Sequence, residues 1–261
     1  MGHTRLGNLP KSTRWRQVVD LIENDRANVG QIASITMDAA ESGLQQAAKD
    51  QGLIQTFWLL TQIALASREN DFVAGLKGAG LKVSSQPTLF DLLAAFSDCV
   101  DSKIRHWGGR TDFGEIASLS AQETLSQILA SHSRSLFGTP ADDLRDALRS
   151  YSSPNQFGSL AHNFFSSFLS RYLKYFLSRE LSNHVGAGKR FSNLNAHTEF
   201  NATLDLHCRQ ISRIVQSFSG SWYSKTEFET GITPEKARDF VYVALKKLRS
   251  ELHLERDNRE A

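Results

Sequence analysis

Apolar residues recur at helical spacing in every long segment of this chain. Near the start they fall at i, i+3, i+4 and i+7, in Trp15, Val18, Val19 and Ile22. Positions three and four apart share one face of a helix, because a helix has about 3.6 residues per turn. No segment shows the period-two alternation that is typical of strands. The pattern therefore predicts an all-α fold, an irregular multi-helix bundle of about eight to ten helices.

Breaks in this pattern divide the chain into predicted helices and loops. Ser12 and Thr13 are capping candidates for the first helix, which is predicted from about residue 13. Further helices are predicted over 28–49, 52–67, 87–104, 120–135, 140–150, 158–182, 198–218 and 233–252. Glycine-containing loops are predicted at 77–80, 106–110 and 183–193, and a turn-like corner at 221–228. We expect an extended arm over 1–12, one helical domain over 13–252 with a weak sub-boundary near residue 153, and a frayed tail over 253–261.

The segment 163–181, "NFFSSFLSRYLKYFLSREL", is the most apolar in the chain. Its apolar side chains occupy more than half of a helical wheel, and Ser167, Ser170, Arg171, Lys174 and Ser178 fill most of the remainder. An arc this wide is typical of a central core helix that touches several neighbours. A subunit interface and a membrane surface are the alternatives.

Composition narrows the class of protein. Apolar residues make up 40% of the chain and charged residues 22%, which is ordinary for a folded domain. The two cysteines, Cys99 and Cys208, lie far apart and form no C-x-x-C pair, which argues against a disulfide framework or a thiolate zinc site. We find neither a secretory signal nor a run long enough to span a membrane, so we expect a cytoplasmic protein without a cofactor.

The segment 231–249, "GITPEKARDFVYVALKKLR", resembles the reading helix of bacterial sigma-factor-like helix-turn-helix domains, which implies contact with DNA. On a helical wheel, however, its apolar residues form one stripe, namely Ala237, Phe240, Val241, Ala244, Leu245, Leu248 and Leu252. The preceding "SWYSKTEF" is interpreted as aromatic and turn-like, with no first helix of the motif. We therefore expect this helix to pack on its own chain.

Two features are candidates for contact with a partner protein. Trp222 and Tyr223 follow a glycine, and aromatic side chains are enriched among the residues that dominate binding energies at interfaces. Packing of this corner onto the last helix is the simpler interpretation. The basic arm over 1–12, which includes Arg5, has no reason to fold alone and has the length to reach into a neighbouring subunit.

Basic residues in predicted loops and on the last helix are the candidates for contact with nucleic acid. Lys189 and Arg190 follow a glycine-rich segment, Arg105 and Arg110 flank Trp107, and Lys246 lies on the last helix. These side chains can neutralise phosphates. The net charge of +2 does not by itself indicate nucleic acid.

Enzymatic motifs are missing from the sequence, including G-x-S-x-G, H-E-x-x-H and a complete P-loop. A site assembled from distant residues, such as His162, His184 or His197 with a carboxylate, stays open as an alternative. Our leading hypothesis is a non-enzymatic helical subunit of a larger bacterial-type protein assembly, with other subunits or further copies of the chain as partners. A nucleic-acid-binding helical module is the second hypothesis, and an enzyme is the third.

Overall fold

The computed structural model describes residues 12–24, 27–106, 109–132 and 141–260, and these ranges contain helices and no strand. The helices are α1 (Thr13–Glu23), α2 (Val29–Ala39), α3 (Glu41–Ala47), α4 (Gln51–Ala66), α5 (Phe72–Gly78), α6 (Leu89–His106), α7 (Asp112–His132), α8 (Ala141–Ser150), α9 (Pro154–Leu181), the 3-10 turn η1 (Ser182–His184), α10 (Leu194–Ile211), α11 (Arg213–Thr230) and α12 (Pro234–Glu260). The predicted all-α bundle is confirmed.

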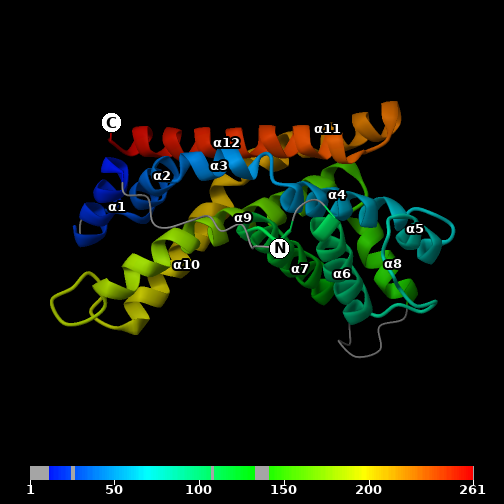
Figure 1. Cartoon of the computed structure of the whole chain (residues 1–261), viewed down its shortest axis with the longest axis horizontal. Helices are drawn as coiled ribbons and strands as arrows, with labels where there is room; N and C mark the ends of the chain where they lie inside the picture. The colour runs from blue at the N-terminus through cyan, green and yellow to red at the C-terminus, as the bar shows by residue number, and fades with distance from the viewer. Residues whose placement is uncertain (1–11, 25–26, 107–108, 133–140, 261) are drawn as a thin grey trace.

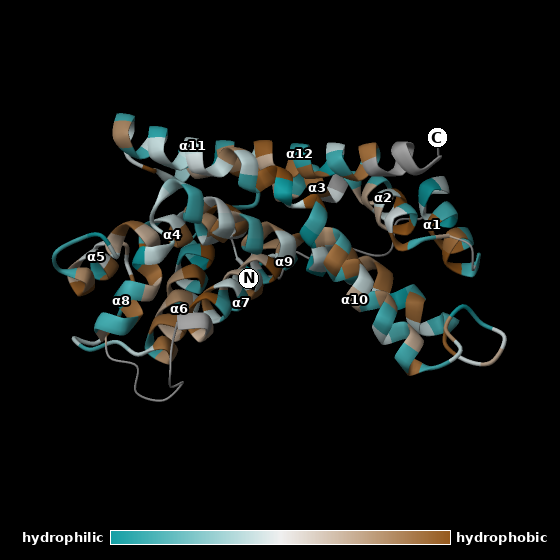
Figure 2. Ribbon diagram, turned by 180° about the vertical axis from the view of Figure 1, so that it is seen from behind, coloured by the Kyte–Doolittle hydropathy of each residue, from teal (hydrophilic) through white to brown (hydrophobic). Residues whose placement is uncertain are grey.

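The longest helix, α9, lies at the centre of the arrangement. It packs against α2, α7, α10 and α11. In Figure 1, α11 and α12 lie along the upper edge, while α10 and the group α6, α7 and α8 extend below it on opposite sides. Figure 2 shows hydrophilic and hydrophobic residues mixed along the helices, as amphipathic packing requires.

Aromatic side chains fill the core between α4, α9, α11 and α12. The ring of Phe57 stacks on that of Phe240 with centroids 4.9 Å apart. Trp222 lies 4.3 Å from the same Phe240 ring, and Phe157 stacks on Tyr223 at 4.0 Å. Centroid separations of this size are typical of favourable aromatic pairs. Four helices that are distant in sequence are therefore joined by one cluster of rings.

The prediction that the apolar arc of 163–181 forms core is confirmed. Phe164, Phe168 and Tyr172 are at most 1% exposed, and their rings follow one another along α9. Within the described residues, no helix combines the length and the apolar character needed to cross a membrane. The arc is covered by neighbouring helices, so its hydrophobic surface is used in folding.

The last helix also packs as predicted. All seven residues of its apolar stripe are buried, from Ala237 to Leu252. Ile232, at the turn before α12, accepts a hydrogen bond at its carbonyl oxygen from Nε1 of Trp58 on α4, over 2.8 Å. The helix continues to Glu260, past residue 252, where we expected the chain to fray.

The predicted corner at 221–228 is wrong, because this segment lies inside α11. Val215, Ser219, Tyr223 and Thr226 form a buried stripe at helical spacing on that helix. Gly220 belongs to the helix as well. A Cβ atom there would lie 2.5 Å from the carbonyl oxygen of Pro154, so the glycine allows α9 and α11 to approach closely. The sequence suggested a turn where the structure needs a residue without a side chain.

The predicted helix over 28–49 divides into α2 and α3 at Ala40. The carbonyl oxygen of Ala40 accepts a hydrogen bond of 2.7 Å from the buried hydroxyl of Tyr172 on α9. The backbone of Ala40 departs from helical geometry, with φ −97° and ψ 13°. A contact between residues far apart in sequence therefore accompanies this break, and a local pattern does not reveal it.

Candidate functional site

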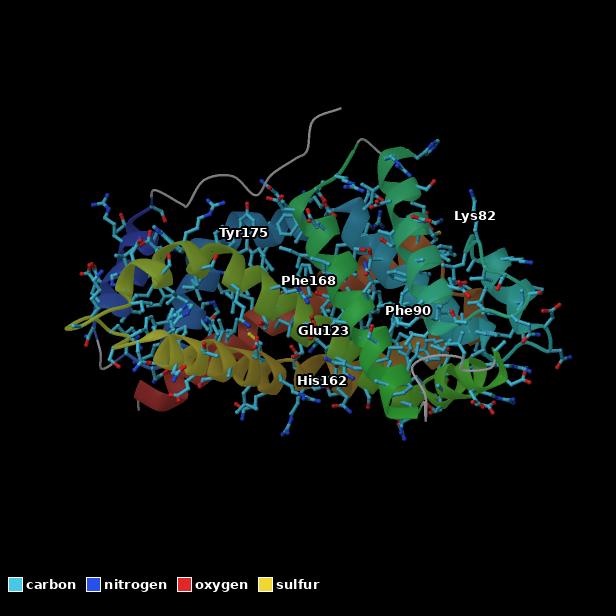
Figure 3. The ribbon with its side chains drawn as sticks, turned by 90° about the horizontal axis from the view of Figure 1, so that it is seen from below. Lys82, Phe90, Glu123, His162, Phe168 and Tyr175 are labelled. Atoms are coloured by element: carbon cyan, nitrogen blue, oxygen red, sulfur yellow. The ribbon has the colours of Figure 1, made fainter. Side chains whose placement is uncertain are left out.

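A polar cleft of about 500 Å³ opens where α7 and α10 flank the middle of α9. We call it the α9 cleft, and its lining residues are Glu123 and Gln127 on α7, Asn163, Ser166, Ser167, Ser170, Arg171 and Lys174 on α9, and Asp205, Leu206 and Arg209 on α10. Figure 3 views the molecule from below, where Glu123 lies near the middle of the face. The volume is in the range of ligand pockets, but the lining is more polar than is usual for a small-molecule site.

The floor of the α9 cleft is a single stripe of α9. Asn163, Ser166, Ser167, Ser170, Arg171 and Lys174 are spaced three, four, seven, eight and eleven residues from the first. Such residues share one face, and the stripe is about 16 Å long at 1.5 Å per residue. Short side chains occupy one end and the two cations occupy the other. This face is opposite the aromatic arc, so the same helix supplies the core and the cleft.

One ion pair joins the floor to the α7 wall. Nη2 of Arg171 lies 3.0 Å from Oε2 of Glu123, and the hydroxyl of Ser167 donates to the same oxygen over 2.5 Å. Nε of Arg171 also donates to the Ser167 oxygen. The side chains of Arg171 and Glu123 are 39% and 40% exposed, so water screens this pair. Its stabilising effect on the fold is therefore small.

A second ion pair joins the floor to the α10 wall. Nζ of Lys174 lies 2.5 Å from Oδ1 of Asp205, and the Ser170 hydroxyl donates to the same oxygen. The two networks repeat one pattern, in which a serine and the cation four residues later share one carboxylate oxygen. Each network fastens α9 to a different neighbouring helix.

Arg209 differs from the other cations of the cleft. Its side chain is exposed, and no carboxylate pairs with it in the part of the chain that the structure describes. Its backbone carbonyl accepts a hydrogen bond of 2.8 Å from Nε2 of His162, which anchors this turn of α10 to α9. Leu206, one turn earlier on α10, is 56% exposed. The α10 wall therefore presents an accessible cation beside an accessible apolar side chain.

Cys208 lies behind the α10 wall, and it is not a lining residue. Burial raises the pKa of its thiol far above the ordinary value, the nearby Asp205 raises it further, and Lys174 opposes both. A thiol held protonated in this way is a poor nucleophile. In the described ranges, no three His, Cys, Asp or Glu side chains are grouped so that they could hold a metal ion.

The predicted partner-binding aromatics lie inside the fold. Tyr223 is fully buried against Phe157, and Trp222 is partly buried among Phe57, Phe157 and Phe240. They have the packing role that we favoured, although on a helix and not at a corner. Arg5 lies outside the described residues.

Three of the five predicted nucleic-acid-binding residues make internal contacts. Arg190 donates hydrogen bonds to backbone carbonyl oxygens at and beyond the end of α1, including those of Leu21 at 3.1 Å and Ala27 at 2.6 Å. Arg110 pairs with Asp101, and Lys189 donates to the carbonyl oxygen of Asn183. The remaining two, Arg105 on α6 and Lys246 on α12, are exposed.

The three candidate histidines lie in different surroundings. His162 is buried on α9, and His184 ends η1. His197 lies on α10 and packs its ring edge-to-face against that of Phe191, with the ring centroids 5.4 Å apart. Among the described residues, no ion pair or hydrogen bond joins any of the three to a carboxylate. The sequence therefore did not identify the α9 cleft, although the stripe of serines and cations on α9 was visible. Its carboxylates and Arg209 come from other helices.

Comparisons with protein-family models, with curated proteins and with solved structures find no match to this chain.

Proposed function

We propose that this chain is a protein-interaction subunit that holds a segment of another protein in the α9 cleft. The observation that carries the proposal is a half-open cleft of mixed charge on the central helix, lined from three helices. Interfaces between proteins combine polar and apolar contacts and often contain bridging water. The serines, the carboxylates and the leucine of this cleft offer these contacts.

The ion pairs of the cleft favour a protein partner over nucleic acid. Arg171 and Lys174 already have carboxylate partners, which leaves Arg209 as the one lining cation without such a partner among the described residues. A phosphate backbone is bound by a run of several available cations, whereas one available cation suits a single carboxylate of a polypeptide. A polypeptide carries both signs of charge and also donors and acceptors for the serines.

Photo-crosslinking in cells of the source organism tests the proposal. Ser166 on the floor of the cleft is replaced by a photoreactive phenylalanine derivative, and the control carries the same residue in place of Arg16, which is exposed on α1. We expect ultraviolet light to give a discrete adduct with another protein from position 166 and none from position 16. Equal adducts from both positions, or none from position 166, would contradict the proposal.

A further inference from the structure

We infer that the segment held in the α9 cleft is an acidic helix of another protein, with a carboxylate that pairs with Arg209. The inference rests on the proposed function and specifies the chemistry of its partner. Three observations carry it, namely the charge balance of the cleft, the space between its walls and the apolar side chains at its edge.

The charge balance of the cleft favours a negative partner. Of its three cations, Arg171 and Lys174 are each paired with a carboxylate, while Arg209 is exposed and has no such partner among the described residues. Arg213, the first residue of α11, is exposed as well. Guanidinium groups bind carboxylates in a planar, two-point geometry, so Arg209 is suited to a Glu or Asp side chain.

The two walls do not close over the floor of the cleft. Both α7 and α10 pack closely on α9, whereas the described residues show no comparable packing of α7 against α10. A helix laid along α9 between them would complete a four-helix arrangement, a common way to cover a helix face. The floor is about 16 Å long, which matches about three turns. The short side chains of Asn163, Ser166 and Ser167 allow the backbone of such a helix to come close.

Apolar side chains stand at the edge of both walls. Leu206 on α10 is 56% exposed, and Leu119 on α7, one turn before Glu123, is 43% exposed. Leu206 and Arg209 are three residues apart and share a face of α10. A partner helix with an apolar residue and an acidic residue one turn apart would contact both. The chemistry of the cleft therefore describes an acidic amphipathic helix.

Charge reversal at Arg209 tests the inference with the photoreactive residue at position 166. We expect Arg209→Glu to lower the adduct yield by about tenfold or more, because one ion pair is lost and replaced by repulsion. Arg209→Lys keeps the charge and should retain most of the yield. The matched control, Arg16→Glu, should leave the yield unchanged. Circular dichroism and thermal melting of each purified variant verify folding, and Arg209→Gln gives an intermediate yield without a reversed charge.

Mass spectrometry of the adduct then identifies the captured segment. We expect a helical sequence from another protein with Asp or Glu beside the crosslinked residue. A synthetic peptide of that segment should bind the full purified chain about tenfold more tightly than its twin with Gln at that acid, by fluorescence anisotropy. The inference would be overturned by an undiminished adduct in Arg209→Glu, by a captured segment without an acid or by capture of a second copy of this chain, while position 166 would still mark a protein-binding site. Capture of a nucleic acid would overturn both the inference and the proposed function. No adduct in the unaltered background would overturn the proposed function itself.

Discussion

The two faces of α9 differ in how their side chains are covered. On one face Phe164, Phe168 and Tyr172 are buried under neighbouring helices. On the opposite face Ser166 and Arg171 stay partly exposed, although that face is also flanked by two helices. The two faces belong to the same residues 154–181, so backbone conformation does not explain the difference. Side-chain chemistry decides which face the chain closes.

Different forces stabilise the contacts of the two faces of α9. Burial of an aromatic ring contributes several kcal/mol through the hydrophobic effect and close packing, about 3 to 5 for a complete ring. An exposed ion pair contributes about 1 kcal/mol or less, because water and salt screen it. We call the face with Phe164, Phe168 and Tyr172 the closed face of α9, and the face with Ser166 and Arg171 the open face. The closed face therefore stabilises the fold, whereas the contacts of the open face are weak enough to be exchanged for those of a partner.

The largest expected effect is on the closed face. Phe168→Ala should lower the free energy of unfolding by about 3 to 5 kcal/mol, because it leaves a cavity between the rings of Phe164 and Tyr172. Ser178→Ala, on an exposed position of the same helix, is the matched control and should change it by no more than about 0.5 kcal/mol. Urea denaturation measures both. Similar values for the two variants would remove the distinction between the faces.

The next effect tests how tightly α9 and α11 approach each other. Gly220→Ala should destabilise the fold by about 1 to 3 kcal/mol, because its Cβ would lie 2.5 Å from the Pro154 carbonyl oxygen and the helices would have to separate. Gly78→Ala on α5 is the control, since its Cβ would have no atom within 4 Å. The free energy of unfolding of that variant should rise by about 0.5 kcal/mol. Thermal unfolding of both gives the comparison, and an unaffected Gly220→Ala would mean that this contact is looser than described.

The closed face was predictable from the sequence, because its signal is local. The apolar arc of α9 and the stripe from Ala237 to Leu252 follow from residue spacing alone, and both are buried. Glycine was a less reliable guide. Gly220 was interpreted as part of a turn, yet it lies within a helix whose neighbour needs the space. Whether a glycine supplies flexibility or allows close approach depends on what packs against it.

The open face could be predicted only in part. Its serines and cations on α9 are visible as a stripe, but Glu123, Asp205 and Arg209 reach it from helices that the sequence does not place beside α9. The same difficulty affected Arg190, a candidate for phosphate contact, which instead binds carbonyl oxygens at and beyond the end of α1. A basic side chain in a loop has the same appearance in the sequence whether its partner is solvent, a ligand or the backbone of the chain.

A smaller effect is expected from the ion pairs of the cleft. Glu123→Gln should change the free energy of unfolding by less than about 1 kcal/mol, because both partners are half-exposed and the amide still accepts a hydrogen bond from Ser167. Urea denaturation at low and high salt measures the change, and the remaining difference should shrink at high salt. A loss of about 3 kcal/mol or more would show that the open face is a structural element of the core and would weaken its assignment to partner binding.

The smallest effect on stability, and the sharpest contrast in accessibility, is expected from cysteine chemistry. Ser166→Cys should leave the free energy of unfolding within about 0.5 kcal/mol of the unaltered chain, since the side chain keeps its size at a partly exposed position. Its thiol should react readily with a disulfide reagent. Cys208 lies behind the α10 wall, where burial raises the pKa of its thiol, so it should react only when the chain unfolds. Equal rates for the introduced thiol at position 166 and for Cys208 would show that α10 opens easily, and the cleft would then lack a fixed wall.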